Sequence, residues 1–491
     1  MFTKAPLLFL AAMITVATAI GTVAQPAARA PDFAAIDAYI KTEMNDDRVP
    51  GVALAIVQND QIAYLRGYGD DGYGRPVTPQ TSFILGSMSK SFTALAIMQL
   101  VERGEIELDA PVQRYLAWFR VADPAASAAL TMRHLLNHTS GIPTHAPQAS
   151  GNSVTLQDHV RVLADVSLNN WPGAKHEYAS PNYLVLGAVI EQITGLSYAA
   201  YIQQHVFAPL QMQHSFTEQN RAIQNGMAQG HRYWFGFPVA ATLEYEDGRM
   251  PTAALISSAE DLGQYLIALL NTGRYGESSV LSPTSIAQMY QSSVPSEGFS
   301  YAFGWRVGTI GDVPAIHHGG IVPHFRGKMV MLPEQRWGVV VLTNASTSFP
   351  LPILPTSHRL ADAIAANLAG QSLVDSSYTQ SIIYLAITIG MALILFSQIA
   401  GLLQVGRWRA QLSSRPRWRV LGEVAVELLW PLFALIGLPR VIGIPWSELL
   451  RGTPDMAWWL IASVVLGLLT CAVKVIAIRQ RPGGGTAART P

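Results

Sequence analysis

The stretch that decides the fold of this chain reads Phe83-Ile84-Leu85-Gly86-Ser87-Met88-Ser89-Lys90-Ser91-Phe92. It has the composition of a loop that runs into a helix, because apolar residues recur with helical spacing over residues 94–101 and Gly104 follows as a stop. Ser87 and Lys90 stand three residues apart, so in a helical turn their side chains lie on one face.

This serine–lysine pair predicts nucleophilic catalysis. A serine hydroxyl is a poor nucleophile until a neighbour takes its proton. A desolvated amine can do so, because burial lowers the pKa of a lysine. A helix N-terminus adds backbone N–H groups where an oxyanion would form. The motif alone is also compatible with an ordinary helix start, in which Ser87 is the N-cap and Lys90 is solvated. Other motifs in the chain are needed to distinguish this from a catalytic pair.

Composition narrows the class of protein. The 491 residues carry no formal net charge, 49% of them are hydrophobic and only 13% are charged, which predicts membrane segments beside a soluble part. There is no basic excess, so nucleic acid is not expected as a partner. The one cysteine, Cys471, allows no intrachain disulfide and no cysteine-based zinc site, and the twelve histidines form no H-E-x-x-H motif. We therefore expect no metal and no cofactor.

Residues 1–24 have the pattern of a secretory signal peptide. Lys4 supplies the positive start, Leu7 to Ala19 is apolar, and Thr22-Val23-Ala24 is a small-residue cleavage site. The alternative is an uncleaved anchor helix. Either way, the part that follows is expected to be exported.

Residues 32–370 are predicted to form one α+β domain. Both ends of this region are rich in strand patterns and its middle, from Glu102 to Arg274, is mainly helical. The expected strands are Val52–Val57, Gln61–Leu65, Tyr301–Val307, Val313–His317, Phe325–Leu332 and Trp337–Thr343, and the expected flanking helices are Asp32–Met44 and Leu351–Leu368. The simplest packing is an antiparallel sheet built from both ends and flanked by helices, with a mostly helical domain inserted between them.

Residues 380–480 are predicted to be a membrane region with three transmembrane helices. The runs Ile382–Leu403, Val420–Val441 and Trp458–Ile478 are each long enough to cross a bilayer. The second run is the weakest candidate for a transmembrane helix, since it contains Glu423, Glu427 and Pro431. Alternatively, it forms a helix that lies flat in the membrane–water interface.

The arginines predict the orientation of these helices. The loop between the first two runs and the C-terminal tail are rich in arginine (Arg407, Arg409, Arg415, Arg417 and Arg419; Arg479, Arg481 and Arg489). By the positive-inside rule both segments are cytoplasmic. Three spans then place the catalytic domain on the extracytoplasmic side of the cell membrane, in agreement with the signal peptide.

Three further motifs follow the segment that contains Ser87 and Lys90. Arg133-His134-Leu135-Leu136-Asn137-His138-Thr139-Ser140-Gly141, Tyr178-Ala179-Ser180 and His318-Gly319-Gly320 follow the Ser87 segment in order. Together they resemble the serine β-lactamase-related family, which includes class C β-lactamases, D-alanyl-D-alanine carboxypeptidases, D-amino-peptidases and related esterases. The resemblance covers roughly Phe33 to Leu368 and implies the β-lactamase/penicillin-binding-protein-like fold.

The resemblance also implies roles for these residues. Ser87 would be the acylated nucleophile, Lys90 its proton partner, and Tyr178 a general base with a pKa lowered by Lys90. Ser180 stands where relatives have an asparagine that orients substrate, which argues more against β-lactam hydrolysis than against simple acyl transfer. Asn182 lies two positions too late to replace it.

The third element of the family falls on His318-Gly319-Gly320, although His317-His318-Gly319 also fits the pattern. In the first register the backbone N–H of Ile321 would complete an oxyanion hole with that of Ser87. His318 and Gly320 would line the substrate site. We expect His138 to be a structural histidine that bonds loop backbone rather than a catalytic one.

The sequence thus favours a membrane-anchored serine hydrolase that acts outside the cytoplasm on an ester, a D-amino-acid peptide or an amide. The expected partners are a small-molecule or peptide substrate and the membrane itself. A β-lactamase or penicillin-binding carboxypeptidase is the nearest alternative. A non-hydrolytic receptor for a cell-wall fragment or β-lactam, and a transporter built from the three helices, are alternatives of other classes.

Overall fold

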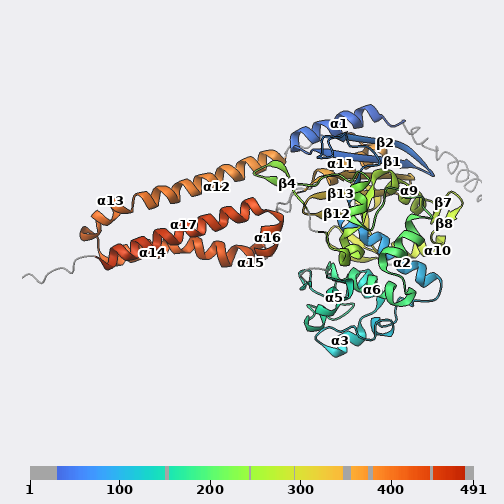
Figure 1. The fold of residues 1–491 in the computed structure, drawn as a ribbon, viewed down its shortest axis with the longest axis horizontal. Coiled ribbons are helices and arrows are strands. Elements are labelled where there is room, and N and C mark those ends of the chain that lie inside the picture. The colour runs from blue at the N-terminus through green and yellow to red at the C-terminus, as the bar shows by residue number, and fades with distance from the viewer. Residues whose placement is uncertain are drawn as a thin grey trace, which may run out of the picture.

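A computed structural model of the chain describes residues 30–149, 154–242, 245–291, 293–346, 355–373, 380–442 and 446–480. The predicted signal peptide lies outside the described residues. Figure 1 shows a main domain (residues 33–368) built on one large sheet, and a bundle of long helices (the C-terminal helices, residues 380–480) that extends from one end of it.

The eight-stranded sheet has the order β2-β1-β14-β13-β12-β11-β10-β9, and all its neighbours are antiparallel. The first strand of the chain, β1, pairs with the late strand β14, so both ends of the domain meet at its centre as predicted. The strands are β1 (Gly51–Gln58), β2 (Gln61–Gly69), β9 (Val294–Ser296), β10 (Phe299–Tyr301), β11 (Arg306–Ile310), β12 (Val313–Val322), β13 (Phe325–Leu332) and β14 (Trp337–Thr343).

Helices cover both faces of this sheet. The helices α1 (Phe33–Asp47) and α11 (Thr356–Leu368) pack on one face, and α9 (Ala259–Leu270) packs on the other, over β1 and β14 (Figure 1). Because both faces are covered, β13 and β14 are buried along their whole length. Each buried aliphatic side chain contributes about 1.5–3 kcal/mol of transfer free energy. Accordingly β14 is almost entirely apolar, whereas β13 also buries Arg326 and Lys328.

The middle of the main domain is helical, as predicted. Its helices are α2 (Ser89–Glu102), α3 (Pro124–Ala129), α4 (Met132–Leu136), α5 (Leu156–Arg161), α6 (Pro181–Thr194), α7 (Tyr198–Ile202), α8 (Gln219–Gln224), α9 and α10 (Pro283–Gln291). Three small sheets accompany them: β3 (Ser82–Ile84) with β6 (Ile256–Ser258), β7 (Arg274–Tyr275) with β8 (Ser278–Ser279), and β4 (His231–Trp234) with β5 (Phe237–Ala240) and β15 (Ala345–Ser346).

Three expected strands differ from the observed ones. The strand expected over Gln61–Leu65 continues to Gly69. The run Tyr301–Val307 is not one strand, because the chain turns at Ala302–Trp305, where Gly304 has a φ of +74° and lies against the backbone of α2. The strand expected to end at His317 continues to Val322. Gly319 and Gly320 lie within this extension, where the His358 side chain approaches one face of the strand and the Leu85 carbonyl the other. The last helix begins at Thr356, and residues 351–354 lie outside the described part of the chain.

The C-terminal helices match the predicted membrane region. Three helical segments of the described chain are long and apolar enough to cross a membrane: Ile382–Leu403, Arg417–Val441 and Pro454–Arg479. The second contains Pro431 and continues through a π-helical turn, since proline cannot donate the usual backbone hydrogen bond. The helices are α12 (Gln380–Leu403), α13 (Val405–Ala410), α14 (Arg417–Leu432), α15 (Leu438–Ile442), α16 (Trp446–Gly452) and α17 (Pro454–Arg479).

Candidate active site

Ser87 and Lys90 lie where the chain leaves β3 and enters α2. Gly86 has a φ of +58°, which permits the sharp turn into the short helix η1 (Gly86–Met88) that carries Ser87. The helix α2 runs through the core, so the Lys90 side chain is fully buried. Its Nζ lies 3.3 Å from Ser87 Oγ, as the spacing of the two residues predicts.

The Lys90 amine is held by oxygens and has no carboxylate among its described contacts. Its Nζ donates to Ser87 Oγ, to Ser180 Oγ at 3.3 Å and to the carbonyl of Thr252 at 3.0 Å. Burial, and then the charges of Arg249 and Arg306, hold the pKa of Lys90 well below its usual value. The amine is thus poised to be neutral and to accept a proton.

The carbonyl of Thr252 was not foreseen from the sequence. It belongs to a π-helical turn, η6 (Met250–Ala254), packed against α2. A carbonyl that points out of a regular helical hydrogen-bond pattern is typical of functional sites. No sequence signal marks it, because every residue carries a carbonyl.

Tyr178 reaches the same point from the loop before α6. Its ring centre lies 5.0 Å from Lys90 Nζ, and its hydroxyl interacts with the side chain of Ser87. The expectation of a lowered pKa is wrong: burial raises the pKa of Tyr178 to about 12, and the interactions with Ser87 and Arg306 offset this only in part. Burial thus favours the neutral phenol form of Tyr178.

Ser180 stands at the N-cap of α6, but its hydroxyl makes no capping hydrogen bond. It accepts from Lys90 instead. Asn182 does not replace the missing amide, because its side chain is buried between Ser140 and His138.

His138 has the structural role that we expected. Its Nδ1 accepts from the backbone N–H of Ala179 at 3.1 Å, and its ring lies 4.3 Å from that of Tyr178. Burial lowers its pKa well below the usual range, so it stays neutral. It therefore fixes the loop that carries Tyr178 and Ser180.

The strand β12 closes the site on the other side. β12 pairs with β11 only as far as His317. Over residues 318–322, η1 packs against β12 instead. A Cβ on Gly320 would lie 1.8 Å from the carbonyl oxygen of Leu85, and a Cβ on Gly86 would lie 2.5 Å from the nitrogen of Ile321. The backbones of η1 and β12 are thus in direct contact, which brings the N–H groups of Ser87 and Ile321 near each other.

The two possible registers of the His-x-Gly element can now be distinguished. His318 is fully buried, and its Nε2 lies 3.1 Å from the hydroxyl of Tyr301, which contacts the ring of His138. Side chains alternate along a strand, and a Cβ on Gly319 would meet His358 of α11 on the opposite face of the sheet. The register His318-Gly319-Gly320 therefore faces the site, and His317 faces away from it.

Arg306 is a second feature that sequence reasoning missed. It follows the turn at Ala302–Trp305, and its Nε is buried with no hydrogen-bond partner among the described residues. Its guanidinium lies 4.6 Å above the ring of Phe299, and its charge lowers the pKa of both Lys90 and His318. It adds positive potential to the site, where negative charge develops in an acyl-transfer reaction.

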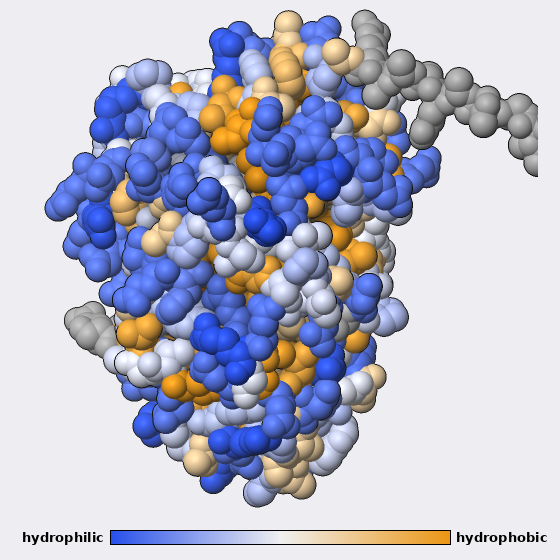
Figure 2. Space-filling view, turned by 90° about the vertical axis from the view of Figure 1, so that its right-hand side faces the viewer, coloured by the Kyte–Doolittle hydropathy of each residue, from blue (hydrophilic) through white to orange (hydrophobic). Residues whose placement is uncertain are grey.

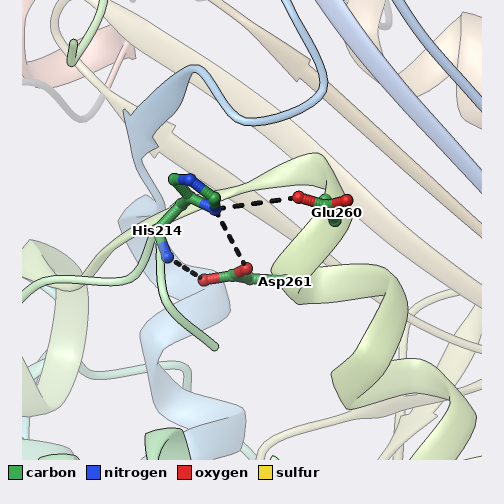
Figure 3. A group of neighbouring side chains, drawn as sticks. All are labelled: His214, Glu260 and Asp261. Carbon is green, nitrogen blue, oxygen red and sulfur yellow. Dashed lines mark hydrogen bonds and ion pairs between the residues drawn. The ribbon is translucent and has the colours of Figure 1, made fainter. Parts of the chain in front are cut away.

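One group of His, Asp and Glu side chains in the described chain is close enough to suggest a metal site. His214 Nδ1 lies 3.7 Å from both Glu260 and Asp261 (Figure 3). The buried Asp261 carboxylate accepts from the backbone N–H of His214 and from the hydroxyl of Ser215, both at 2.7 Å. These bonds tie a loop to the start of α9 and account for the buried carboxylate. No residue of this group contacts Ser87 or Lys90 in the described structure.

Comparison with known proteins identifies the family that the chain resembles over most of its main domain. The sequence profile of the protein family described as Beta-lactamase matches residues 36–363. Protein flp of Staphylococcus aureus (strain MW2) is 29% identical over 319 residues, which cover 64% of this chain and 63% of that protein. The chain therefore spans less than two-thirds of the length of this curated relative.

Two further relatives are informative. Teichoic acid D-alanine hydrolase of Staphylococcus aureus (strain MRSA252) is 30% identical over 205 residues, covering 41% of this chain and 49% of that protein. Among solved structures, the octameric penicillin-binding protein homologue from Pyrococcus abyssi matches with a TM-score of 0.58 and 27% identity, over 70% of this chain and 78% of that chain.

Proposed function

The chain belongs to the beta-lactamase family, and on that premise we propose that it is a serine hydrolase that forms an acyl-enzyme on Ser87. The observation that carries the proposal is the fully buried amine of Lys90, 3.3 Å from the Ser87 hydroxyl and without a carboxylate among its described contacts. A neutral amine at this distance can take the hydroxyl proton at the moment when the oxygen attacks.

In the acylation step, Ser87 Oγ forms a bond to the carbonyl carbon of the substrate and its proton passes to Lys90 Nζ. The carbonyl oxygen becomes negative and is held by the backbone N–H groups of Ser87 and Ile321. When the bond to the leaving group breaks, Tyr178 gives that group its phenolic proton and regains one from Lys90. The Ser87 proton thus ends on the leaving group, and both proton carriers return to their resting state.

Deacylation repeats the step with water as the nucleophile. Water attacks the acyl carbon, its proton passes through Tyr178 and Lys90 to Ser87 Oγ, and the free acid leaves. His318 and Tyr301 contribute positioning, since their hydrogen bond lies on the face of β12 that closes the site. The reaction needs no cofactor.

The preferred substrate is an ester or amide of a D-amino acid, with a D-alanyl ester as the first choice. Two observations support this choice. A relative is named Teichoic acid D-alanine hydrolase, and Ser180 replaces the asparagine that the family resemblance leads one to expect. A hydroxyl at this position keeps the contact to Lys90 but offers no amide N–H to a substrate.

A penicillin-binding carboxypeptidase or β-lactamase is the second candidate. The similarity to the penicillin-binding protein homologue favours it. A receptor that binds without hydrolysis is the less favoured alternative, because the side chains of Lys90, Ser87 and Tyr178 lie close enough together to serve as a proton relay.

We also propose that the domain acts on the extracytoplasmic side of the membrane. The arginine-rich loop between α12 and α14 favours a cytoplasmic position for that end of the bundle, and the main domain lies at the other end (Figure 1). The multi-pass anchor would then hold the enzyme close to substrates of the cell surface.

The experiment compares three substrates with the full-length protein in detergent: a chromogenic D-alanyl ester, its L-alanyl counterpart and a chromogenic cephalosporin. We expect turnover of the D-ester, little of the L-ester and slow reaction of the cephalosporin. All turnover should disappear in Ser87→Ala and persist in Ser89→Ala, since the Ser89 hydroxyl faces the backbone of Leu255. Fast cephalosporin turnover would make the second candidate the better one, and turnover by Ser87→Ala would refute both.

A further inference from the structure

The hairpin of β4 and β5 links the main domain to the C-terminal helices. Phe235 and Gly236 form its two-residue turn, both with positive φ (49° and 82°), as tight hairpins require. Strand β4 also pairs in parallel with β15, which directly follows the central strand β14. The hairpin is thus fixed to the large sheet and is not a loose loop.

One face of the hairpin and its tip pack on the helix ends. Tyr233 belongs to a buried cluster with Tyr384 of α12 and Met456 of α17. The backbone N–H of Phe235 donates to Asp455 at 2.9 Å. Tyr384 lies two residues after Ile382 and Asp455 one residue after Pro454, the first residues of two candidate spans. At 1.5 Å per residue, both lie within about 3 Å of the starts of those spans. The hairpin tip therefore lies at the level where these spans would enter the bilayer.

The other face of the hairpin is mainly apolar and only partly exposed, because Phe237 and Val239 are exposed whereas Trp234 and Arg232 are half-buried. Trp234 pairs with Phe237, and Arg232 pairs with Val239, so these four side chains share one face. The Phe237 side chain is 58% exposed and that of Val239 is 44% exposed. Within the described main domain, the Arg48 side chain lies over the Phe237 ring on this face, and Phe237 and Val239 remain exposed beside it.

Two arginines accompany the aromatic rings. The Arg48 guanidinium lies 4.5 Å above the ring of Phe237 and also donates to the carbonyl of Gly236. Arg232 lies 5.5 Å from the ring of Trp234. Aromatic rings and long cationic side chains are the residues that membrane–water interfaces favour, because the apolar parts lie among the acyl chains and the polar ends reach the headgroups.

We propose that this face (Trp234, Phe237, Val239 and Arg232, the hairpin face) lies in the headgroup region of the adjacent lipid leaflet. The hairpin face lies beside the ends of two candidate spans, where lipid headgroups surround the protein. The guanidinium groups of Arg48 and Arg232 can bind the phosphates of those headgroups. The opposite end of the main domain differs: Figure 2 shows mostly hydrophilic residues there, with apolar ones in small groups among them. The hairpin would hold the main domain at a fixed height and orientation above the bilayer. This inference does not depend on the proposed reaction.

The test uses nitroxide spin labels in nanodiscs of phosphatidylethanolamine and phosphatidylglycerol. The single cysteine is first removed by Cys471→Ala, and a label is then attached to Val239→Cys. The matched control is Glu277→Cys, which lies in the turn of the β7–β8 hairpin at the opposite end of the domain (Figure 1). We expect the label at position 239 to be several-fold more accessible to oxygen, and less accessible to a water-soluble nickel complex, than the label at position 277.

A second label at Phe237→Cys keeps the test decisive if one variant folds poorly. Equal aqueous accessibility at positions 237, 239 and 277 would overturn the proposal. An immobilised label without enhanced oxygen accessibility would also overturn it, because protein and not lipid would then cover the hairpin face.

Discussion

Lys90 carries most of the chemistry at the scale of single residues. Its amine is buried among three oxygens, and the nearest charges that affect it are the like charges of arginines. A buried lysine without a counter-charge is costly to the folded state. A destabilising buried lysine with a strongly lowered pKa is typical of a functional site, where a neutral amine is needed for the reaction.

The pH dependence of turnover follows from this burial. Because the active form of Lys90 is the neutral amine, kcat/KM should rise with pH through the lowered pKa of Lys90 and then reach a plateau. The same shift makes the folded state lose stability as the pH falls below 10.5, since the unfolded chain binds the proton more readily. Stopped-flow kinetics across pH 4 to 10 checks the profile.

The control is Lys90→Arg, which is charged at every pH. It should lower kcat by about 10²–10⁴-fold without an acidic limb in the profile. A flat profile in the natural protein would contradict the role of Lys90 as the base.

Ser180 offers a second test at this scale. Its hydroxyl contacts Lys90 and does not cap α6. Ser180→Ala should therefore lower kcat by up to about tenfold, the effect of losing one hydrogen bond of about 1 kcal/mol, with little change in stability. Ser197 is the matched control, because its hydroxyl caps α7. Ser197→Ala should cost about 1 kcal/mol of unfolding free energy and leave kcat unchanged. Kinetics and urea unfolding of both variants give the comparison, and the reverse pattern would be inconsistent with this assignment.

At the scale of elements, the contact between η1 and β12 determines whether the site forms. The sequence predicted both segments, because their motifs have fixed spacing. The residue pattern ended this strand at His317, whereas the family resemblance placed the N–H of Ile321 on it, and the observed β12 runs to Val322. Gly319 and Gly320 are each required by a different neighbour, His358 on one face and Leu85 on the other, and such neighbours are invisible in a single sequence.

Gly320→Ala tests this contact. The new Cβ would meet the carbonyl oxygen of Leu85, so β12 has to move away from η1. We expect a loss of more than about 10²-fold in kcat and of about 1–3 kcal/mol in stability. Gly308→Ala on the neighbouring strand is the control, because its Cβ would make only ordinary contacts with Phe299. Equal activities of the two variants would show that the oxyanion site does not depend on this close approach.

At the scale of the whole molecule, the sequence predicted the fold class, an antiparallel sheet with helices followed by three long apolar helices. Hydropathy alone indicates the three long helices. The strand-rich ends indicate one sheet in which an early strand pairs with a late one, as β1 does with β14. The carbonyl of Thr252, the charge of Arg306 and the docking of the β4–β5 hairpin on α12 could not be predicted. They depend on which surfaces meet after folding, and no local residue pattern encodes that.

The topology can be tested with single cysteines in the Cys471→Ala background. Ser414→Cys lies in the arginine-rich loop and Glu277→Cys lies in the main domain. In spheroplasts, a membrane-impermeant maleimide should label position 277 at once and position 414 only after permeabilisation, because positive loops are retained in the cytoplasm. The opposite labelling pattern would place the main domain inside the cell.

The central claim is that Ser87 is the nucleophile, and the most direct measurement is covalent labelling with a fluorescent fluorophosphonate. The detergent-solubilised protein is labelled, digested and analysed by mass spectrometry, with Ser87→Ala and Ser89→Ala as paired variants. We predict one modified peptide that carries the label on Ser87, labelling of Ser89→Ala, and none of Ser87→Ala. Labelling of the Ser87→Ala variant, or no labelling of the natural protein, would contradict the assignment of this site.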